Sequence, residues 1–278
     1  VASGTVPLSY QWKSNSVSVA NATNDTFTIF NVTTNLNGST YSVTVTNVAG
    51  STNSQTATLT VNLPSSPSGS TNTISLLTYN VKGNSATDWS TNSAQVQAIG
   101  RQLQYLNPDI ITFQEIPNDL SYEMTNFVNV FLPGYSLARN SGTDGYIRSM
   151  IASRFPITRS TSWLGWVDLR AFGYSNANNN LDNFTRDLFE AQMTAPGFPR
   201  PLHVFTAHLK ATGTNYADSA AKRAAEAAAI TNFFATNLFV LYPFDPYVLT
   251  GDMNDSDTNA VALQRLFSPL TGLNLTNP

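Results

Sequence analysis

Short runs of alternating apolar and polar residues fill the first 62 positions of the chain. Residues 8–12 and 41–45 show this period of two, and turn residues separate such runs at about the 8–12-residue spacing of all-β domains. Strands with this pattern bury one face and expose the other. The pattern predicts a β-sandwich over residues 1–62, and the Pro/Ser/Gly-rich stretch at 63–73 predicts a linker.

From residue 74 onward, buried-strand patterns alternate with helical ones. Residues 74–81 and 109–115 are apolar strand patterns, and residues 90–105 between them have helical spacing. The same reasoning predicts helices at 120–131 and 219–234 and strands at 148–157, 188–193, 202–207 and 247–252. Strand–helix–strand order is typical of an α/β protein, so the chain from 74 to 278 is predicted to form an α/β domain. In its Ala-rich helix, the charged Arg223 and Glu226 are expected on a solvated face.

Few residues of the chain carry a charge. Charged residues make up 11% of the sequence, well below the roughly 25% of an average soluble protein. Asn, Ser and Thr take their place, which is typical of a secreted protein. The balance of 14 Lys+Arg against 17 Asp+Glu excludes a broad basic field for long nucleic acid. A phosphate-bearing partner therefore has to be bound locally, and we expect an extracellular or cell-surface location.

Cysteine and long apolar segments are both missing from the sequence. The lack of Cys excludes disulfides and thiolate metal sites. The longest apolar stretch, residues 233–244, is interrupted by polar residues and is shorter than the ~18 residues that a membrane span needs. We therefore expect no membrane span.

Five polar side chains lie at the carboxyl ends of predicted strands: Asn80, Glu115, His208, Asp252 and Asn254. Each has an ordinary alternative, since Gly-Asp-X-Asn is common in turns, a terminal Glu can face solvent, and a lone His can sit in a core. Asp252 and Asn254 are two residues apart and therefore share one face of an extended segment. Because strand ends of α/β sheets gather at one edge, where ligands bind, the five together predict a ligand site.

Five segments resemble, in order, the signatures of the endonuclease/exonuclease/phosphatase superfamily. They are residues 78–81 (TYNV), 108–115 (PDIITFQE), 150–157 (MIASRFPI), 206–209 (TAHL) and 250–254 (TGDMN). The resemblance implies a four-layered α/β/β/α sandwich, with two β-sheets face to face and helices outside. It also implies hydrolysis of a phosphodiester, in a nucleic acid or in another phosphodiester substrate.

The resemblance further implies a role for each of the five residues. Glu115 would bind the divalent metal, with Asn80 beside it, and Asp252 would orient or deprotonate the attacking water. Asn254 would position that water, and His208 would donate a hydrogen bond to a phosphate oxygen. Carboxylate and amide oxygens suit a hard cation, so Mg²⁺ is the expected metal, with Mn²⁺ or Ca²⁺ as alternatives.

Arg186 is a weaker candidate, placed just before a predicted strand. Its guanidinium can steady a substrate phosphate. A salt bridge with Asp187 or another neighbour is the commoner use of such a residue.

The chain departs from the family pattern at its C-terminal end. Family members finish with a further aspartate and a Ser-Asp-His signature, and neither occurs before Pro278. We expect the reading frame to continue for about 50–80 residues that contain both, the length that a domain of ordinary size still needs.

The N-terminal residues resemble a bacterial immunoglobulin-like module. Residues 7–12 and 38–47 look like its central strands, and Trp12 corresponds to its core tryptophan. The module's opening strands have no counterpart, so the predicted sandwich is incomplete. Since an unpaired strand edge accepts an added strand, we expect a segment of another molecule, or a preceding segment of the same one, to complete it.

Two functions of different classes are consistent with these patterns. One is a secreted, metal-dependent, nuclease-like phosphodiesterase attached to an immunoglobulin-like module. The other is a non-catalytic extracellular structural or filament-forming protein built from both domains. The five polar residues favour the enzyme, whereas the incomplete sandwich and the sparse charge favour the structural protein.

Overall fold

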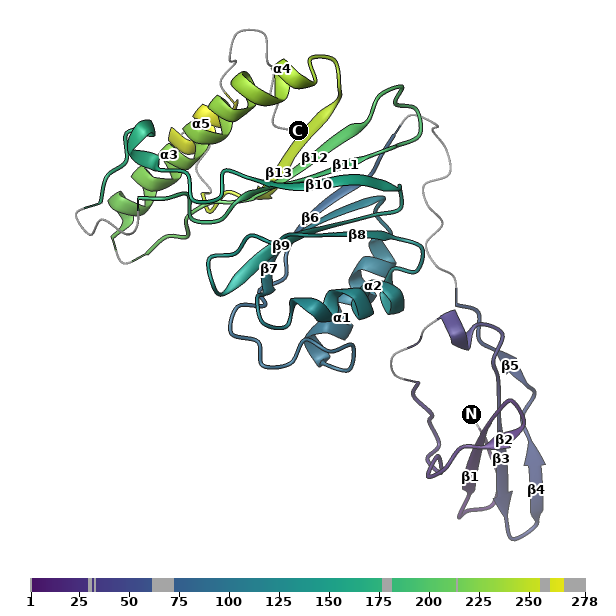
Figure 1. The fold of residues 1–278 in the computed structure, drawn as a ribbon. Coiled ribbons are helices and arrows are strands. Elements are labelled where there is room, and N and C mark those ends of the chain that lie inside the picture. Colours follow the sequence, from purple (N-terminus) through teal and green to yellow (C-terminus); the bar gives the residue numbers. More distant parts are fainter. Residues whose placement is uncertain are drawn as a thin grey trace. The chain divides into compact units, whose positions relative to one another are not determined.

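The chain divides into two units, Val1–Ser66 and Pro67–Pro278, in a computed structural model (Figure 1). The structure describes residues 2–29, 32, 34–61, 73–176, 182–213, 215–255 and 261–267. The division falls inside the predicted linker, most of which lies outside the described residues. The predicted domain limits themselves stay a prediction.

One antiparallel sheet makes up the N-terminal unit. Its order is β2 (Val17–Ser18), β1 (Ser9–Ser14), β3 (Thr40–Asn47) and β4 (Gly50–Asn53), with β5 (Ala57–Thr58) also paired to β3; a short helix, η1, spans Thr34–Leu36. The described residues thus form a single sheet, and they include no second sheet facing it. The immunoglobulin-like sandwich and its completion by another segment stay predictions.

Aromatic rings hold this small sheet together. The Trp12 ring stacks on Phe27 at 5.7 Å, and Phe27 contacts Tyr41 at 6.1 Å. The Trp12 indole N–H donates to the carbonyl of Asn24 at 3.0 Å. All three rings are only partly buried, because no layer covers them within the described residues. Trp12 therefore has an aromatic and a hydrogen-bonding partner but lies in no closed core of the described residues, and its role as a core tryptophan stays a prediction.

Two four-stranded sheets form the centre of the C-terminal unit. The first has the order β6 (Leu76–Asn80), β7 (Ile110–Pro117), β9 (Ile147–Ser153), β8 (Ser136–Arg139), and the second β10 (Ile157–Trp163), β11 (Leu188–Met193), β12 (Leu202–His208), β13 (Tyr247–Asp252). Only β6–β7 and β12–β13 among these neighbours are parallel. The sequence patterns did not predict β8, and the single strand predicted at 148–157 corresponds to β9, so β10 was not predicted either.

Helices lie on the outer faces of the two sheets (Figure 1). They are α1 (Ala94–Leu106), α2 (Met124–Phe131), α3 (Tyr216–Phe233), α4 (Phe239–Leu241) and α5 (Val261–Phe267), with short 3₁₀ segments η2 (Ser121–Glu123) and η3 (Leu169–Phe172) and a π segment η4 (Phe234–Leu238). α1 ends at Asn107, whose left-handed backbone returns its N–H to the carbonyl of Leu103. The layers run helix, sheet, sheet, helix, so the predicted α/β architecture is confirmed.

Each interface between layers has its own apolar core. Ile110 and Ile151 of the first sheet meet Phe189 and Val204 of the second. A second core lies between the first sheet and α1 and α2, and a third lies between the second sheet and α3. Alternate residues of β7 therefore face different cores, as a strand covered on both sides requires.

The longest helix runs from Tyr216 to Leu241 through α3, η4 and α4. By length and composition its 26 residues could cross a membrane, with a mean hydropathy of 1.3 in the most apolar window. Of that window 56% is buried, and Ala225, Ile230 and Phe233 pack into the core against the second sheet. Its apolar composition is therefore that of a core helix. The helix predicted at 219–234 is therefore present and extends further at both ends, so the apolar stretch 233–244 overlaps only its C-terminal part.

Candidate functional site

The parallel pair β12–β13 brings two predicted site residues side by side. Its register aligns His208 with Asp252, and Ala207 with Gly251 one position earlier. Gly251 has a φ of +131°, and a Cβ there would lie 1.8 Å from the Ala207 carbonyl oxygen. Only glycine allows the two strands to approach this closely, so the sequence at Gly251 places the Asp252 carboxylate beside His208.

Glu115 reaches the same edge through a β-bulge in β7. It does not end its strand as predicted, because β7 continues to Pro117. The pairing of β7 with β9 shifts register between Phe113 and Ile116, and Glu115 in this bulge has a φ of +61°. A bulge turns one side chain out of the regular alternation. Here it allows the Glu115 side chain to lie in the site while its neighbours remain in the sheet.

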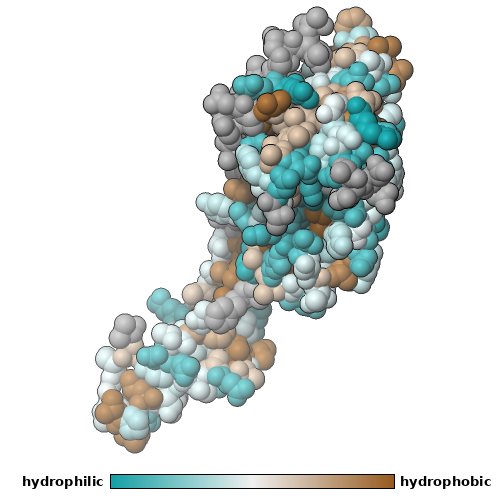
Figure 2. All heavy atoms as spheres, turned by 90° about the vertical axis from the view of Figure 1, so that its left-hand side faces the viewer, coloured by the Kyte–Doolittle hydropathy of each residue, from teal (hydrophilic) through white to brown (hydrophobic). Residues whose placement is uncertain are grey.

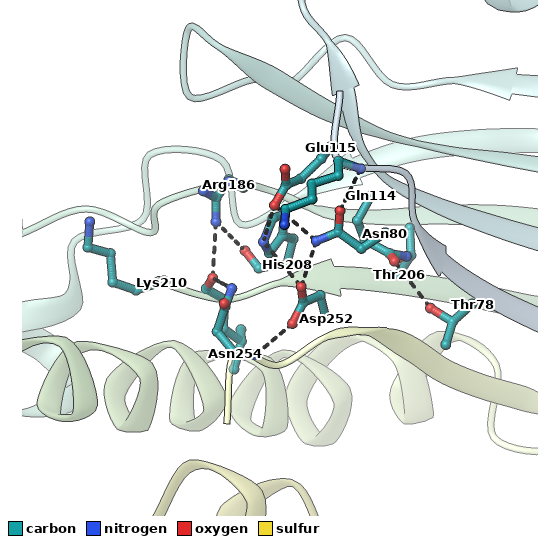
Figure 3. A network of polar contacts seen from close by, with 12 residues as sticks. Thr78, Asn80, Gln114, Glu115, Arg186, Thr206, His208, Lys210, Asp252 and Asn254 are labelled. Carbon is teal, nitrogen blue, oxygen red and sulfur yellow. Dashed lines mark hydrogen bonds and ion pairs between the residues drawn. The ribbon is translucent and has the colours of Figure 1, made fainter. Parts of the chain in front are cut away.

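Asn80 joins the two carboxylates (Figure 3). Its amide nitrogen donates to Glu115 Oε1 at 2.9 Å and to Asp252 Oδ2 at 2.8 Å. Its amide oxygen accepts the backbone N–H of Lys82 at 2.9 Å. Asn80 therefore lies beside Glu115, as predicted, but presents a nitrogen to the carboxylates. Its role as a metal ligand stays a prediction.

Asn254 fixes the segment that follows β13. Its backbone N–H donates to Asp252 Oδ1 at 2.9 Å, and its side-chain amide donates to the carbonyl of Leu209 at 2.9 Å. Both oxygens of Asp252 thus accept a hydrogen bond, one from Asn80 and one from Asn254. The carboxylate is held in a single orientation at the edge of the sheets.

His208 is almost fully buried, with 2% of its surface exposed. Its Nε2 atom lies 3.8 Å from Asp252 Oδ2 and 4.0 Å from Glu115 Oε1, while Nδ1 has no hydrogen-bond partner among the described residues. Burial, and next the nearby Arg186, lower the pKa of His208 to about 4, although Asp252 opposes this shift. His208 is therefore neutral at pH 7.

Arg186 lies next to this cluster and is paired, but not with Asp187. Its Nε donates to Asp144 Oδ2 at 2.8 Å. Its Nη1 donates to the carbonyls of His208 and Leu209 at 3.2 and 3.0 Å. The ion pair with another neighbour is thus present, and the guanidinium also holds the chain directly after β12.

Beneath the site, the interface between the two sheets is polar. Gln114 donates to Thr206 Oγ1 at 2.9 Å and accepts from Thr78 at 3.3 Å. The hydroxyls of Thr112 and Thr250 lie 2.9 Å apart. Sequence reasoning missed these residues, because a polar side chain in an apolar strand shows no partner until the sheets are stacked. They link the strands that carry the site residues.

Two buried charges on α3 bind the loop after β12 and the segment before β11. Glu226 accepts the backbone N–H groups of Thr185 and Lys210 at 2.9 and 2.8 Å. Arg223 donates to the carbonyl of Lys210 at 3.2 Å and pairs with Asp255 Oδ2 at 3.2 Å. Neither Arg223 nor Glu226 is exposed, so the expectation of a solvated face was wrong. The helix had to carry these charges inward, because the loop presents its backbone polar groups there.

Glu115, His208 and Asp252 form a group that can hold a metal ion. One ligand atom from each lies within 4.8 Å of the others. Ligands bound to one hard cation at about 2.0–2.6 Å are at most about 5 Å apart, so this spacing fits. Two carboxylates facing a neutral imidazole also leave the cluster with negative charge. The donor set matches a divalent cation.

The geometry agrees with a comparison of the whole sequence with protein families. A sequence model described as "Endonuclease/Exonuclease/phosphatase family" matches residues 77–268. The chain belongs to this family. The matched region includes all six predicted site residues and both sheets. No curated protein matches the chain.

Solved structures with similar folds have low sequence identity. A humanized D. rerio TDP2 with 14 mutations has 20% identity and a TM-score of 0.47, covering 66% of this chain and 68% of that one. D. rerio TDP2 complexed with single-strand DNA product has 19% sequence identity and a TM-score of 0.46, and the match covers 66% of this chain and 62% of that one. Sphingomyelinase C from Streptomyces griseocarneus has 16% sequence identity and a TM-score of 0.49, and the match covers 70% of this chain and 68% of that one. The match thus spans slightly less than two thirds of the DNA-bound TDP2 chain.

Proposed function

We propose that this chain is a metal-dependent phosphodiesterase of nuclease-like type that cleaves its substrate by attack of water. The observation that supports it most directly is the convergence of Glu115, His208 and Asp252 from three strands within 4.8 Å. Membership of the endonuclease/exonuclease/phosphatase family supports a hydrolytic reaction. The low charge of the surface supports a secreted protein, and we propose an extracellular location.

Glu115 would hold the divalent ion together with a carboxylate oxygen of Asp252. Mg²⁺ is the proposed ion, with Mn²⁺ and Ca²⁺ as alternatives; when bound, it supplies positive charge to the phosphate oxygens. Asn80 keeps both carboxylates in place by donating to each. The two side chains are 19% and 30% exposed, so water and substrate can reach them.

Asp252 is the proposed base for the attacking water. Its Oδ1 and Oδ2 atoms accept hydrogen bonds from Asn254 and Asn80, which direct the remaining lone pairs. A positioned base contributes about 10²- to 10⁴-fold to the rate. Neutral His208 carries one N–H, which it would donate to a phosphate oxygen.

The first experiment measures thermal unfolding in EDTA and with Mg²⁺, Mn²⁺ or Ca²⁺, together with hydrolysis of bis-p-nitrophenyl phosphate. At 100 times its dissociation constant a metal adds about 2.7 kcal/mol of stability, a rise of about 5–10 °C for a domain of this size. Glu115→Gln should lose this rise and the hydrolysis, whereas the surface control Glu123→Gln should keep both. An equal rise in both variants would show that the metal binds elsewhere.

A further inference from the structure

A cavity of about 230 Å³ lies next to the proposed catalytic site. Residues of three connections and of α3 line it, among them Trp166, Asp187, Arg186, Lys210 and Lys222. Two lining residues connect the cavity to the site: Arg186 contacts the carbonyl of His208, and Lys210 follows His208 by two positions. The cavity therefore adjoins the proposed catalytic site. Figure 3 shows Arg186 and Lys210 extending on one side of the carboxylates. A group attached to a bound phosphodiester can enter the cavity directly.

Positive charge gathers in this cavity. Three of the chain's 14 Lys+Arg line it, namely Arg186, Lys210 and Lys222. Two acids line it as well: Asp144 is paired with Arg186, and Asp187 Oδ1 accepts from the side-chain amide of Asn140 at 2.7 Å. With three cations against two acids, the lining favours an anionic group and disfavours a quaternary ammonium. Because the whole chain has a charge of −3, this is a local attraction and not a general one.

Trp166 supplies an exposed aromatic face at the cavity. Its side chain is 80% exposed, and its backbone has a φ of +65°, next to Leu164 with +62°. Large residues rarely adopt this conformation, and such positions are kept mainly where function requires them. Figure 2 shows hydrophilic and hydrophobic residues interspersed on the face that it draws. A large exposed ring is suited to stacking.

The volume of the cavity is below the roughly 300–1,000 Å³ of drug-sized pockets, so it suits one small group such as a single nucleotide base.

We propose that this cavity binds the nucleotide adjacent to the cleaved phosphodiester, with its base stacked on Trp166 and its phosphate held by Lys210. The substrate is then a single-stranded nucleic acid, because a paired base cannot stack on a side chain. A choline phospholipid is the disfavoured substrate, since its ammonium would meet two lysines. This inference rests on the proposed function for the position of the scissile bond.

The test is binding of a fluorescent single-stranded octanucleotide to the 278-residue chain in EDTA, followed by anisotropy. Trp166→Ala and Lys210→Met should each weaken binding by about fivefold or more, the effect expected for loss of one stacked base or one phosphate contact. Tyr105→Ala on α1 is the matched control, because that ring is 77% exposed on the other sheet's helix. Tyr105→Ala should leave octanucleotide binding unchanged.

Two further measurements separate the possible failures. Tyr105→Ala should hydrolyse bis-p-nitrophenyl phosphate at the wild-type rate; if the wild type does not hydrolyse it, the proposed function fails while the binding test still stands. Unchanged octanucleotide binding in both variants would overturn the cavity proposal. Binding of phosphatidylcholine vesicles that Trp166→Ala weakens, with no effect on the oligonucleotide, would overturn it in favour of a lipid.

Discussion

Glu226→Gln tests whether the buried charges of α3 hold the site loops in place. The carboxylate accepts two backbone N–H groups, from Thr185 and Lys210, and is fully buried. The amide of glutamine has the same shape but only one acceptor oxygen. One of the two N–H groups would therefore face an NH₂ group, with no water to replace the lost bond.

The expected cost follows from these two hydrogen bonds. A hydrogen bond to a charged group contributes about 1.5–3 kcal/mol, against about 1 kcal/mol for a neutral one. The variant loses one charged bond and weakens the other, so we expect a loss of about 2–4 kcal/mol. For a domain of this size that lowers the melting temperature by about 5–15 °C.

The assay is thermal and urea unfolding of Glu226→Gln beside Glu123→Gln. Glu123 is the matched control because, among the described residues, its carboxylate accepts only the side chain of Asn126, at a solvated surface. Its loss should stay within about 0.5 kcal/mol.

Activity of the same variant gives a second readout. Lys210 follows His208 by two residues, so release of its N–H should lower kcat for bis-p-nitrophenyl phosphate more than it raises KM. Unfolding of Glu226→Gln at the same temperature as the control would refute the reasoning, because the two hydrogen bonds would then contribute nothing.

Three other substitutions test separate features. Gly251→Ala should prevent native pairing of β12 and β13, since its Cβ would lie 1.8 Å from the Ala207 oxygen; circular dichroism should show lost structure, and a native melting curve would contradict this. Asn80→Asp should destabilise the chain in EDTA by about 2–4 kcal/mol, because two donated hydrogen bonds become repulsion, and divalent metal should recover part of the loss. Burial raises the pKa of Asp187, so the folded chain binds a proton there more tightly than the unfolded chain does. The free energy of unfolding therefore falls as pH rises above the unfolded pKa of about 3.9. Asp187→Asn should reduce this pH dependence of stability and raise the melting temperature at pH 7, and an unchanged pH dependence between pH 4 and 7 would contradict the prediction.

The residues that meet in the site could be predicted from the sequence, because their position depends on local rules. Apolar strand patterns end at Asn80, His208 and Asp252, and neighbouring parallel strands bring such ends to one edge of a sheet. Gly251 is also a local requirement, since only glycine allows both its backbone conformation and the close approach to the Ala207 carbonyl. The α/β class follows from the alternation of strand and helix patterns.

Tertiary structure decided how those residues are oriented and what surrounds them. The bulge at Glu115 depends on pairing with β9, a strand far along the chain, so no local pattern shows it. Arg186 pairs with Asp144 and not with its sequence neighbour Asp187, because the folded loops bring the Asp144 carboxylate to its guanidinium. The charges of α3 face inward because the loop after β12 offers them backbone partners. Sequence spacing fixes which side of an element a residue occupies, whereas the partner on that side exists only after distant segments have packed together.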